Sequence, residues 1–333
     1  MKRCLVTGGC GFIGSNLTIE LVKRGWKVDV VDDMSNGHIE SLSGLNIRCL
    51  PNGSFMPEFE KVEMEKRSDG TVLIIQDDFS NINVLNKIES GCYDVVFHQA
   101  AIPRVSYSVE NPGETTDSNI SSTVRLLEAC RGNVKRVVFA SSSSVYGGAD
   151  ILPTSEDHAK DPKSPYAWQK SSIEELAEMF YNLYDLDIAC LRYFNVFGPG
   201  QYGDSPYSTA VSAWCHGLKN GSPLRSDGTG EQSRDMCYVE NVVQANMLAA
   251  ESNMVFKGRC YNVACGDRVT NNEILEYLTR RFSSAVIENA PWRPGDVMHT
   301  QADITRASEE LGYKPSVRFW EGLELTLQWW GLQ

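Results

Sequence analysis

A glycine-rich stretch close to the N-terminus constrains the fold more than any other part of this sequence. It runs from Val6 to Ser15 and follows the apolar run Cys4-Leu5-Val6. Beyond the glycines, apolar side chains recur at helical spacing, at Phe12, Ile13, Leu17, Leu21 and Val22. This order predicts a strand, a tight turn and the first turns of a helix. The stretch is therefore typical of a βα unit in an α/β fold.

The glycines of this turn are spaced as in a phosphate-binding loop. Gly9, Gly11 and Gly14 match G-x-G-x-x-G, and Gly8, Gly11 and Gly14 match G-x-x-G-x-x-G. In such loops one glycine makes the sharp turn, a second lets a pyrophosphate approach the backbone, and a third lets helix and strand pack closely. The N–H groups at the helix start then face the phosphates. An ordinary tight turn can carry the same glycines, so a second observation is needed.

An acidic residue after the next apolar run is that observation. The run from Trp26 to Val31 ends in Asp32-Asp33, and Asp32 lies 18 residues after Gly14. A carboxylate at about this distance accepts hydrogen bonds from the ribose of a bound dinucleotide. Its charge repels a 2′-phosphate, which favours NAD over NADP. We expect NAD to be held here by Gly8, Gly11, Phe12, Ile13, Gly14, Asp32 and Asp33.

Composition excludes several classes of function. The chain has 333 residues and a net charge of −12, from 31 basic and 43 acidic side chains. This charge argues against non-specific binding to nucleic acid or to anionic membranes. No apolar run approaches membrane-spanning length, and Lys2-Arg3 is followed by too few apolar residues for a signal peptide. The ten cysteines form no C-x-x-C pair or zinc-like spacing, so we expect reduced thiols, no metal site and a cytoplasmic location.

Predicted strands and helices alternate through the N-terminal part of the chain. After the first two strands, further strands are expected at 71–76, 94–98, 135–140 and 186–193, and helices at 81–88, 116–130 and 165–183. This alternation predicts a doubly wound parallel sheet of the Rossmann type. The polar residues 35–46 and the charged segment within 50–70 are expected to form a solvated surface insertion with at most a short helix.

Small and polar residues follow the carboxyl ends of these strands. They include Asp78, Phe79, Gln99-Ala100-Ala101 and Ser142. Ligands of doubly wound sheets bind beyond the carboxyl ends of the strands, so we expect these residues on one rim with the glycine turn.

The regular alternation of predicted strands and helices ends near Val196. Residues 200–235 are rich in Gly, Ser, Pro and Asp, and shorter helices are expected at 211–218, 241–251, 271–282 and 305–311. We expect residues 1–195 to form the NAD-binding domain and residues 196–333 to form a smaller α/β substrate-binding lobe. Residues 236–263, which include a predicted strand at 259–263, are expected to return to the main sheet.

Tyr166 and Lys170 are candidates for acid–base chemistry. They are four residues apart on a predicted helix and so share one face. A cation beside a phenol favours the phenolate and lowers its pKa, which would make Tyr166 a general base near neutral pH. Surface Tyr–Lys pairs at this spacing are common. A catalytic role for this pair is favoured only because the same sequence also predicts a dinucleotide-binding fold and carries the serines 141–144.

Taken together, these motifs resemble the extended short-chain dehydrogenase/reductases. The resemblance covers nearly the whole chain, with the glycine turn, His98-Gln99-Ala100-Ala101, Ser142 before Val145-Tyr146-Gly147, Tyr166 with Lys170, and Arg192-Tyr193-Phe194-Asn195. Within this group the chain looks like the NAD-dependent epimerase/dehydratase family. Arg234-Asp235, Arg293-Pro294-Gly295-Asp296 and Ala302-Asp303 are similar to UDP-hexose 4-epimerases, and His299-Thr300 to UDP-N-acetylhexosamine 4-epimerases.

The resemblance implies a role for each motif in the reaction. Asp32 and Asn36 would hold the adenosine ribose and its phosphate, and Asp78-Phe79 the adenine. Tyr166 would take the proton from the sugar 4-hydroxyl, assisted by Ser142, while Lys170 would hold the nicotinamide ribose. NAD would remove the C4 hydride and return it to the other face of a transient 4-keto sugar.

The resemblance also implies a substrate site. Asn195, Arg234 and Arg293 would hold the nucleotide diphosphate, a dianion that suits two arginines. Thr300 would border the C2 substituent of the sugar, where a small residue leaves space for an N-acetyl group. We therefore expect UDP-N-acetylglucosamine and its galacto epimer as substrates. A homodimer through the helices at 116–130 and 166–183 is expected on the same basis.

One departure from the wider family narrows the chemistry. Dehydratases of this branch carry Asp-Glu directly after the catalytic Ser or Thr, where this chain has Ser143 and Ser144. The acid and base for eliminating water are thus missing. A UDP-glucuronate 4-epimerase or decarboxylase remains an alternative, as does a catalytically silent NAD-binding structural or regulatory protein. His98 fits a buried, hydrogen-bonded structural residue as well as it fits a catalytic one. His299 fits a loop residue equally well.

Overall fold

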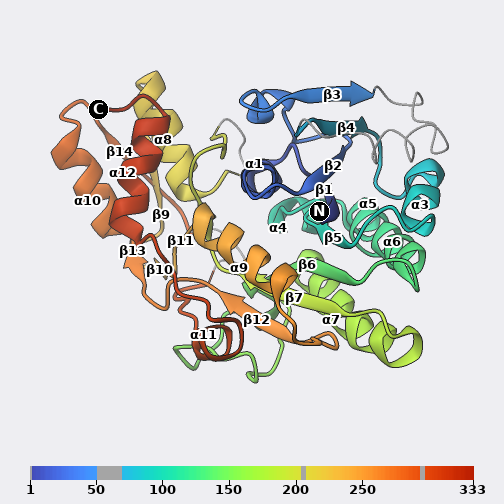
Figure 1. Ribbon diagram of the computed structural model, residues 1–333. Coiled ribbons are helices and arrows are strands. Elements are labelled where there is room, and N and C mark those ends of the chain that lie inside the picture. The colour runs from blue at the N-terminus through green and yellow to red at the C-terminus, as the bar shows by residue number, and fades with distance from the viewer. Residues whose placement is uncertain (1, 51–69, 204–207, 293–296) are drawn as a thin grey trace.

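The computed structural model describes residues 2–50, 70–203, 208–292 and 297–333. An eight-stranded sheet lies at its centre (Figure 1). In chain order its strands are β1 (Arg3–Thr7), β2 (Lys27–Asp32), β3 (Ile47–Leu50), β4 (Val72–Gln76), β5 (Val95–His98), β6 (Arg136–Ser142), β7 (Ile188–Tyr193) and β12 (Cys260–Val263). They lie in the order β12-β7-β6-β5-β1-β2-β4-β3, and every neighbouring pair is parallel. The predicted doubly wound parallel sheet is confirmed.

Helices cover both faces of this sheet, which explains why its central strands are apolar on both sides. On one face, α1 (Phe12–Lys23) packs against α9 (Val239–Glu251) over a buried cluster that includes Leu17 and Val242. The opposite face carries α3 (Ile82–Glu89), α6 (Ser122–Cys130) and α7 (Pro165–Tyr184), which bury a second cluster. Burial of these two apolar layers holds the glycine turn rigidly at the sheet's centre.

The region between β2 and β4 departs from the expected surface insertion. A short 3₁₀ helix at Ile39–Leu42 is followed by β3, which pairs with β4 as the edge strand of the large sheet. Sequence reasoning missed this strand because an edge strand is half solvated and its residues alternate weakly. Residues 51–69, which contain the charged segment from Glu58 to Arg67, lie outside the described residues.

A segment from the C-terminal half completes the large sheet. β8 (Val196–Phe197) pairs with β11 (Cys237–Tyr238), α9 follows, and β12 then lies beside β7. The buried guanidinium of Arg136 on β6 donates to the carbonyl oxygens of Ala249 and Ser252 at the end of α9, at 2.8 and 2.7 Å. These bonds satisfy carbonyl groups that a helix end leaves unpaired. Of the residues 236–263 predicted to return to the main sheet, β12 lies in it, whereas β11 pairs with β8 in a separate two-stranded sheet.

The smaller lobe is built around a third apolar cluster. Its helices are α8 (Ala210–Asn220), α10 (Asn271–Arg281) and α12 (Phe319–Trp329), at the left of Figure 1. Two short strand pairs join them: β9 (Leu224–Asp227) with β14 (Ile287–Ala290), and β10 (Ser233–Arg234) with β13 (Val269–Thr270). The sequence analysis predicted neither α12 nor these strand pairs, whose strands of two to four residues show no clear periodicity.

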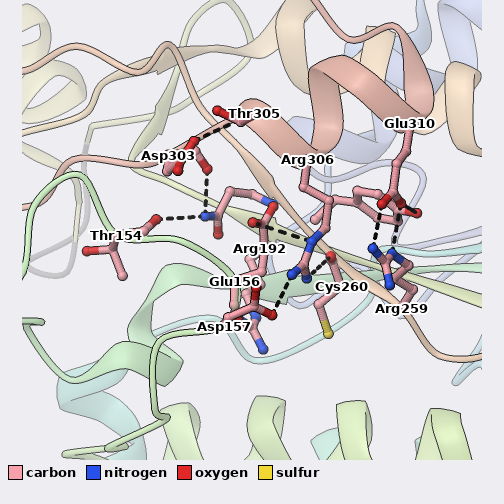
Figure 2. A network of polar contacts seen from close by, with 12 residues as sticks. Thr154, Glu156, Asp157, Arg192, Arg259, Cys260, Asp303, Thr305, Arg306 and Glu310 are labelled. Carbon is pink, nitrogen blue, oxygen red and sulfur yellow. Dashed lines mark hydrogen bonds and ion pairs between the residues drawn. The ribbon is translucent and has the colours of Figure 1, made fainter.

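A polar network ties the segment that follows the serine cluster to the returning strand (Figure 2). The side-chain amide of Asn262 on β12 donates to the carbonyl oxygens of Thr154 and Asp303, at 2.9 and 3.0 Å. Arg306, on α11 (Thr305–Leu311), donates to Asp157 at 2.5 Å. The Tyr146 hydroxyl donates to the same Asn262 side chain at 2.7 Å, so the network also holds the segment that follows Ser142.

Candidate active site

Steric contacts in the glycine turn leave no space for side chains. Gly8 has φ of +67°, and a Cβ there would lie 2.9 Å from the backbone of Ala100. A Cβ on Gly14 would lie 2.0 Å from the carbonyl oxygen of Gly8. The first position needs glycine for its left-handed backbone as well as for space, and the second lets α1 pack directly against the end of β1. The sequence pattern thus corresponds to a tightly packed cradle.

The start of α1 is open to an anion. Gly11 is the N-cap residue, no side chain caps the helix, and the first turn contains no acidic residue. Its N–H groups and the positive end of the helix dipole are therefore available to phosphate oxygens. Phe12 and Ile13 turn their side chains to the apolar cluster of the smaller lobe. Any part they take in holding a cofactor is consequently through their backbone.

A cavity lies beside this turn, at the carboxyl ends of the strands. The predicted residues that line it are Gly8, Asp32, Asp33, Asn36, Asp78, Phe79, Gln99, Ala100 and Ala101. Asp32 is seven per cent exposed, and its carboxylate accepts hydrogen bonds from the N–H groups of Cys10 and Met34, at 2.9 and 3.0 Å. Burial raises the pKa of Asp32, and these bonds oppose that rise. A Cβ on the neighbouring Gly37 would lie 2.5 Å from the Asp32 carboxylate.

These features fit a dinucleotide. The glycine cradle gives close access to the backbone, the uncapped helix start suits a pyrophosphate, and the carboxylate of Asp32 suits a ribose. Sequence reasoning had brought these residues together only by assuming a common rim. The structure shows that the strand order β5-β1-β2 produces that rim.

The helix α7 presents the candidate catalytic pair. Ser164 caps it by accepting a hydrogen bond from the N–H of Ala167, and Pro165 occupies the first helical position. Tyr166 and Lys170 are both buried on the same face, and the Lys170 ammonium lies 5.8 Å from the centre of the Tyr166 ring. The Ser142 hydroxyl, at the end of β6, lies close enough to the Tyr166 phenol to act on its pKa. The structure therefore brings the three predicted residues together.

The pKa of Tyr166 differs from the expectation. Burial raises it to about 12, and the neighbouring Ser142 hydroxyl acts in the opposite direction. The Lys170 ammonium lies over the Tyr166 ring but donates its hydrogen bond to the Ala140 carbonyl, at 2.7 Å, and not to the phenol. Burial also lowers the pKa of Lys170 itself to about 7. Lys170 alone does not make Tyr166 a base near neutral pH, so the added positive charge of a nicotinamide is required for that role.

Sequence reasoning missed a buried amide that organises this side of the site. Asn119 lies in a π-helical turn, Asp117–Ser121, within the helix expected at 116–130. Its side chain binds both the N–H and the carbonyl of Ile102, at 2.8 and 3.1 Å, and donates to Gln169 on α7 at 2.8 Å. It thereby links the loop after β5 to the catalytic helix. A short polar run inside an apolar helix pattern was the available signal, since π turns often occur at functional sites.

Two of the predicted substrate residues are in direct contact. The Asn195 amide donates to the Thr300 hydroxyl at 3.2 Å, and that hydroxyl also receives the N–H of Asp235 at 3.3 Å. Arg234 lies one residue earlier and donates to the carbonyl of Met298 at 3.2 Å. Arg293 lies outside the described residues.

The two histidines behave as structural residues in this arrangement. His98 is one per cent exposed and bonded through both ring nitrogens, to Thr7 at 2.7 Å and Thr123 at 2.9 Å, and burial lowers its pKa to about 3. His299 pairs with Ser233 at 2.8 Å.

Comparison with known proteins decides the family. Residues 4–264 match the model of the NAD dependent epimerase/dehydratase family, which is most of the chain. This chain belongs to that family. The expected NAD cofactor and the expected enzyme class, an NAD-dependent nucleotide-sugar 4-epimerase and thus an isomerase, are confirmed at the level of the family and its characterised members.

Three relatives match along nearly the whole length of both chains. UDP-glucose 4-epimerase of Mycolicibacterium smegmatis is 34% identical over 331 residues, which cover 98% of this chain and 97% of that protein. The solved UDP-N-acetylglucosamine 4-epimerase of Methanobrevibacter ruminantium M1, in complex with UDP-N-acetylmuramic acid, is 34% identical, with a TM-score of 0.85 over 98% of this chain and 97% of that one. The UDP-glucuronic acid 4-epimerase of Bacillus cereus, solved with UDP-glucuronic acid and NAD, is 28% identical, with a TM-score of 0.82 over 99% of each chain.

Among the described residues, no helix combines the length and apolar character that crossing a membrane requires.

Proposed function

We propose that this family member interconverts UDP-N-acetylglucosamine and UDP-N-acetylgalactosamine at C4. The observation that carries the proposal is the grouping of half-buried Ser142 with buried Tyr166 and Lys170 at the carboxyl end of β6, the strand next to β5 and the cofactor cavity. Tyr166 removes the proton of the sugar 4-hydroxyl and later returns it, with Ser142 bridging the two oxygens. When bound, NAD supplies reversible hydride acceptance at the same carbon. Lys170 orients the catalytic helix and contributes positive charge near the phenol.

The substrate side of the proposal concerns the cluster around Thr300. Asn195 and Arg234 hold the diphosphate, together with Arg293. Thr300 borders the sugar C2 substituent, and its small side chain, held by Asn195 and Asp235, leaves space for an N-acetyl group. The Methanobrevibacter relative, with its N-acetylated ligand, supports this choice. Ser143 and Ser144 offer no carboxyl group for eliminating water, which favours epimerisation over dehydration.

Turnover of a panel of UDP-sugars in deuterium oxide tests the proposal. We expect both N-acetylated substrates to be epimerised at least as well as UDP-glucose. No deuterium should appear at C5, because 4-epimerisation does not break the C5–H bond, and none at C4, because the transferred hydride does not exchange with water. Deuterium at C5 would contradict 4-epimerisation. No turnover of any sugar by NAD-loaded protein would instead favour the catalytically silent alternative.

UDP-glucuronate is the second candidate substrate. The Bacillus cereus structure with UDP-glucuronic acid and NAD is the observation that favours it. A kcat/KM for UDP-glucuronate about a hundredfold above that for UDP-N-acetylglucosamine would replace our substrate assignment, and release of carbon dioxide would identify a decarboxylase.

We also propose that the protein is a homodimer that pairs through the helices at 116–130 and 166–183, the second of which lies within α7. Trp168, Met179 and Leu183 on α7 are between 50% and 63% exposed, which is unusual for apolar side chains of this size. Light scattering that gives the mass of a single 37.1 kDa chain at micromolar concentration would exclude this assembly.

A further inference from the structure

Two loops leave the sheet on opposite sides of the glycine turn. Because β1 lies between β5 and β2, the segments after β5 and after β2 flank the start of α1. Both segments line the cofactor cavity, through Ile102 on the β5 side and Asn36 on the β2 side. A dinucleotide that extends across the glycine turn therefore passes between these two loops.

One side chain joins the two loops. Nη2 of Arg104 donates a 2.8 Å hydrogen bond to Oδ1 of Asn36. Arg104 directly precedes α4 (Val105–Glu110), and its loop is fixed at Ile102 by the two bonds from buried Asn119. The opposite loop is fixed by the N–H of His38, which donates to the carbonyl of Cys10 in the glycine turn at 3.0 Å. Arg104 is thus a link between two anchored loops.

The cofactor cavity is lined by acidic side chains, so a cation beside it, such as Arg104, would favour the binding of an anionic cofactor. Asp32, Asp33, Asp77 and Asp78 line the cavity, and its lining within the described residues contains neither lysine nor arginine. The pyrophosphate of NAD carries two negative charges. At the glycine turn the start of α1 offers it a partial positive charge, which is smaller than the charge of a cation. A guanidinium carries a full charge and five N–H donors in a planar fork, so a bond to Asn36 is compatible with donation to phosphate oxygens.

We propose that Arg104 is a further cofactor-binding residue, whose guanidinium is positioned by Asn36, pairs with the pyrophosphate of NAD and slows its release. None of the sequence motifs assigns a role to Arg104. If Arg104 only held the two loops together, its effect on NAD release would depend little on salt, because Asn36 is neutral. Pairing with a phosphate is screened by salt, so its effect should weaken as the salt concentration rises.

Exchange of bound NAD against excess labelled NAD in the holoenzyme tests this proposal at low and high salt. Arg104→Ala should exchange NAD about tenfold faster or more at low salt, as expected for loss of a charge-assisted hydrogen bond. The difference from the wild type should shrink at high salt, and Arg104→Lys should recover part of it. Arg280→Ala, which removes the same charge from an exposed pair with Glu276 on α10, should exchange like the wild type.

Two results would overturn the proposal. One is exchange from Arg104→Ala at the wild-type rate. The other is a faster rate that is independent of salt and is not restored by lysine, which would reduce Arg104 to a loop staple. The measurement needs no sugar substrate, so its outcome is independent of the proposed substrate.

Discussion

The ammonium group of Lys170 donates a 2.7 Å hydrogen bond to the carbonyl oxygen of Ala140, inside β6. This bond crosses from the catalytic helix to the strand whose last residue is Ser142. Tyr166 lies one helical turn before Lys170, so the same anchor holds its phenol beside the Ser142 hydroxyl. Lys170 therefore positions the reacting groups of both elements as well as carrying charge.

Replacing Tyr166 by phenylalanine removes the proposed proton acceptor without changing the buried ring. We expect kcat to fall by about 10²- to 10⁴-fold, the usual contribution of a general acid–base group. NAD content and the thermal unfolding midpoint should stay close to those of the wild type. Steady-state kinetics on the folded variant checks this, and near-normal turnover would remove Tyr166 from the mechanism.

The low pKa of Lys170 predicts a pH-dependent stability. Burial lowers this pKa to about 7, while a lysine in the unfolded chain titrates near 10.4. Between these values the unfolded state binds a proton that the folded state lacks, so the free energy of unfolding rises with pH. NAD-free wild-type protein should gain stability relative to Lys170→Met between about pH 7 and about pH 9. Urea unfolding across that range measures the difference, which a normal lysine would leave constant.

Thr300→Tyr should change the choice of sugar. A tyrosine ring would crowd an N-acetyl group, and overpacking typically costs about 1–3 kcal/mol. We expect kcat/KM for UDP-N-acetylglucosamine to fall about tenfold or more relative to UDP-glucose. Thr300→Val is the matched control, because it keeps the shape and loses only the hydrogen bonds with Asn195 and Asp235. If the valine variant shifts the preference equally, bulk at this position is not the cause.

Removing one partner of a buried ion pair away from the site should greatly reduce the stability of the protein. Lys87 and Asp29 are one per cent and zero per cent exposed, their charged atoms are 2.8 Å apart, and the Tyr93 hydroxyl donates to the same carboxylate at 2.9 Å. Lys87→Met leaves a buried carboxylate without its cation, which should cost about 3–5 kcal/mol. Urea unfolding measures this loss. The double variant with Asp29→Asn should recover part of it, and no recovery would show that lost packing dominates.

Local sequence patterns were sufficient for much of the architecture. The glycine turn, Asp32 and the alternation of apolar strands with amphipathic helices predicted the parallel sheet and the rim that carries the cofactor cavity. Tyr166 and Lys170 could be paired from their spacing alone, because four residues of helix place two side chains on one face. Each of these inferences depends on residues that are neighbours along the chain or on a rule common to all parallel sheets.

Other features arise only when distant segments meet. β3 is an edge strand because its backbone pairs with that of β4. β12 lies beside β7 in the sheet, although about 70 residues of chain separate the two strands. The link from Arg104 to Asn36 joins two loops that are separated in the described chain by the strands β3, β4 and β5. The pKa values of Tyr166 and Lys170 moved opposite to the simple pair argument, because burial outweighs the charge of one neighbour. Sequence determined which groups this protein carries and on which elements, whereas tertiary packing decided which of them are desolvated and which distant loops they join.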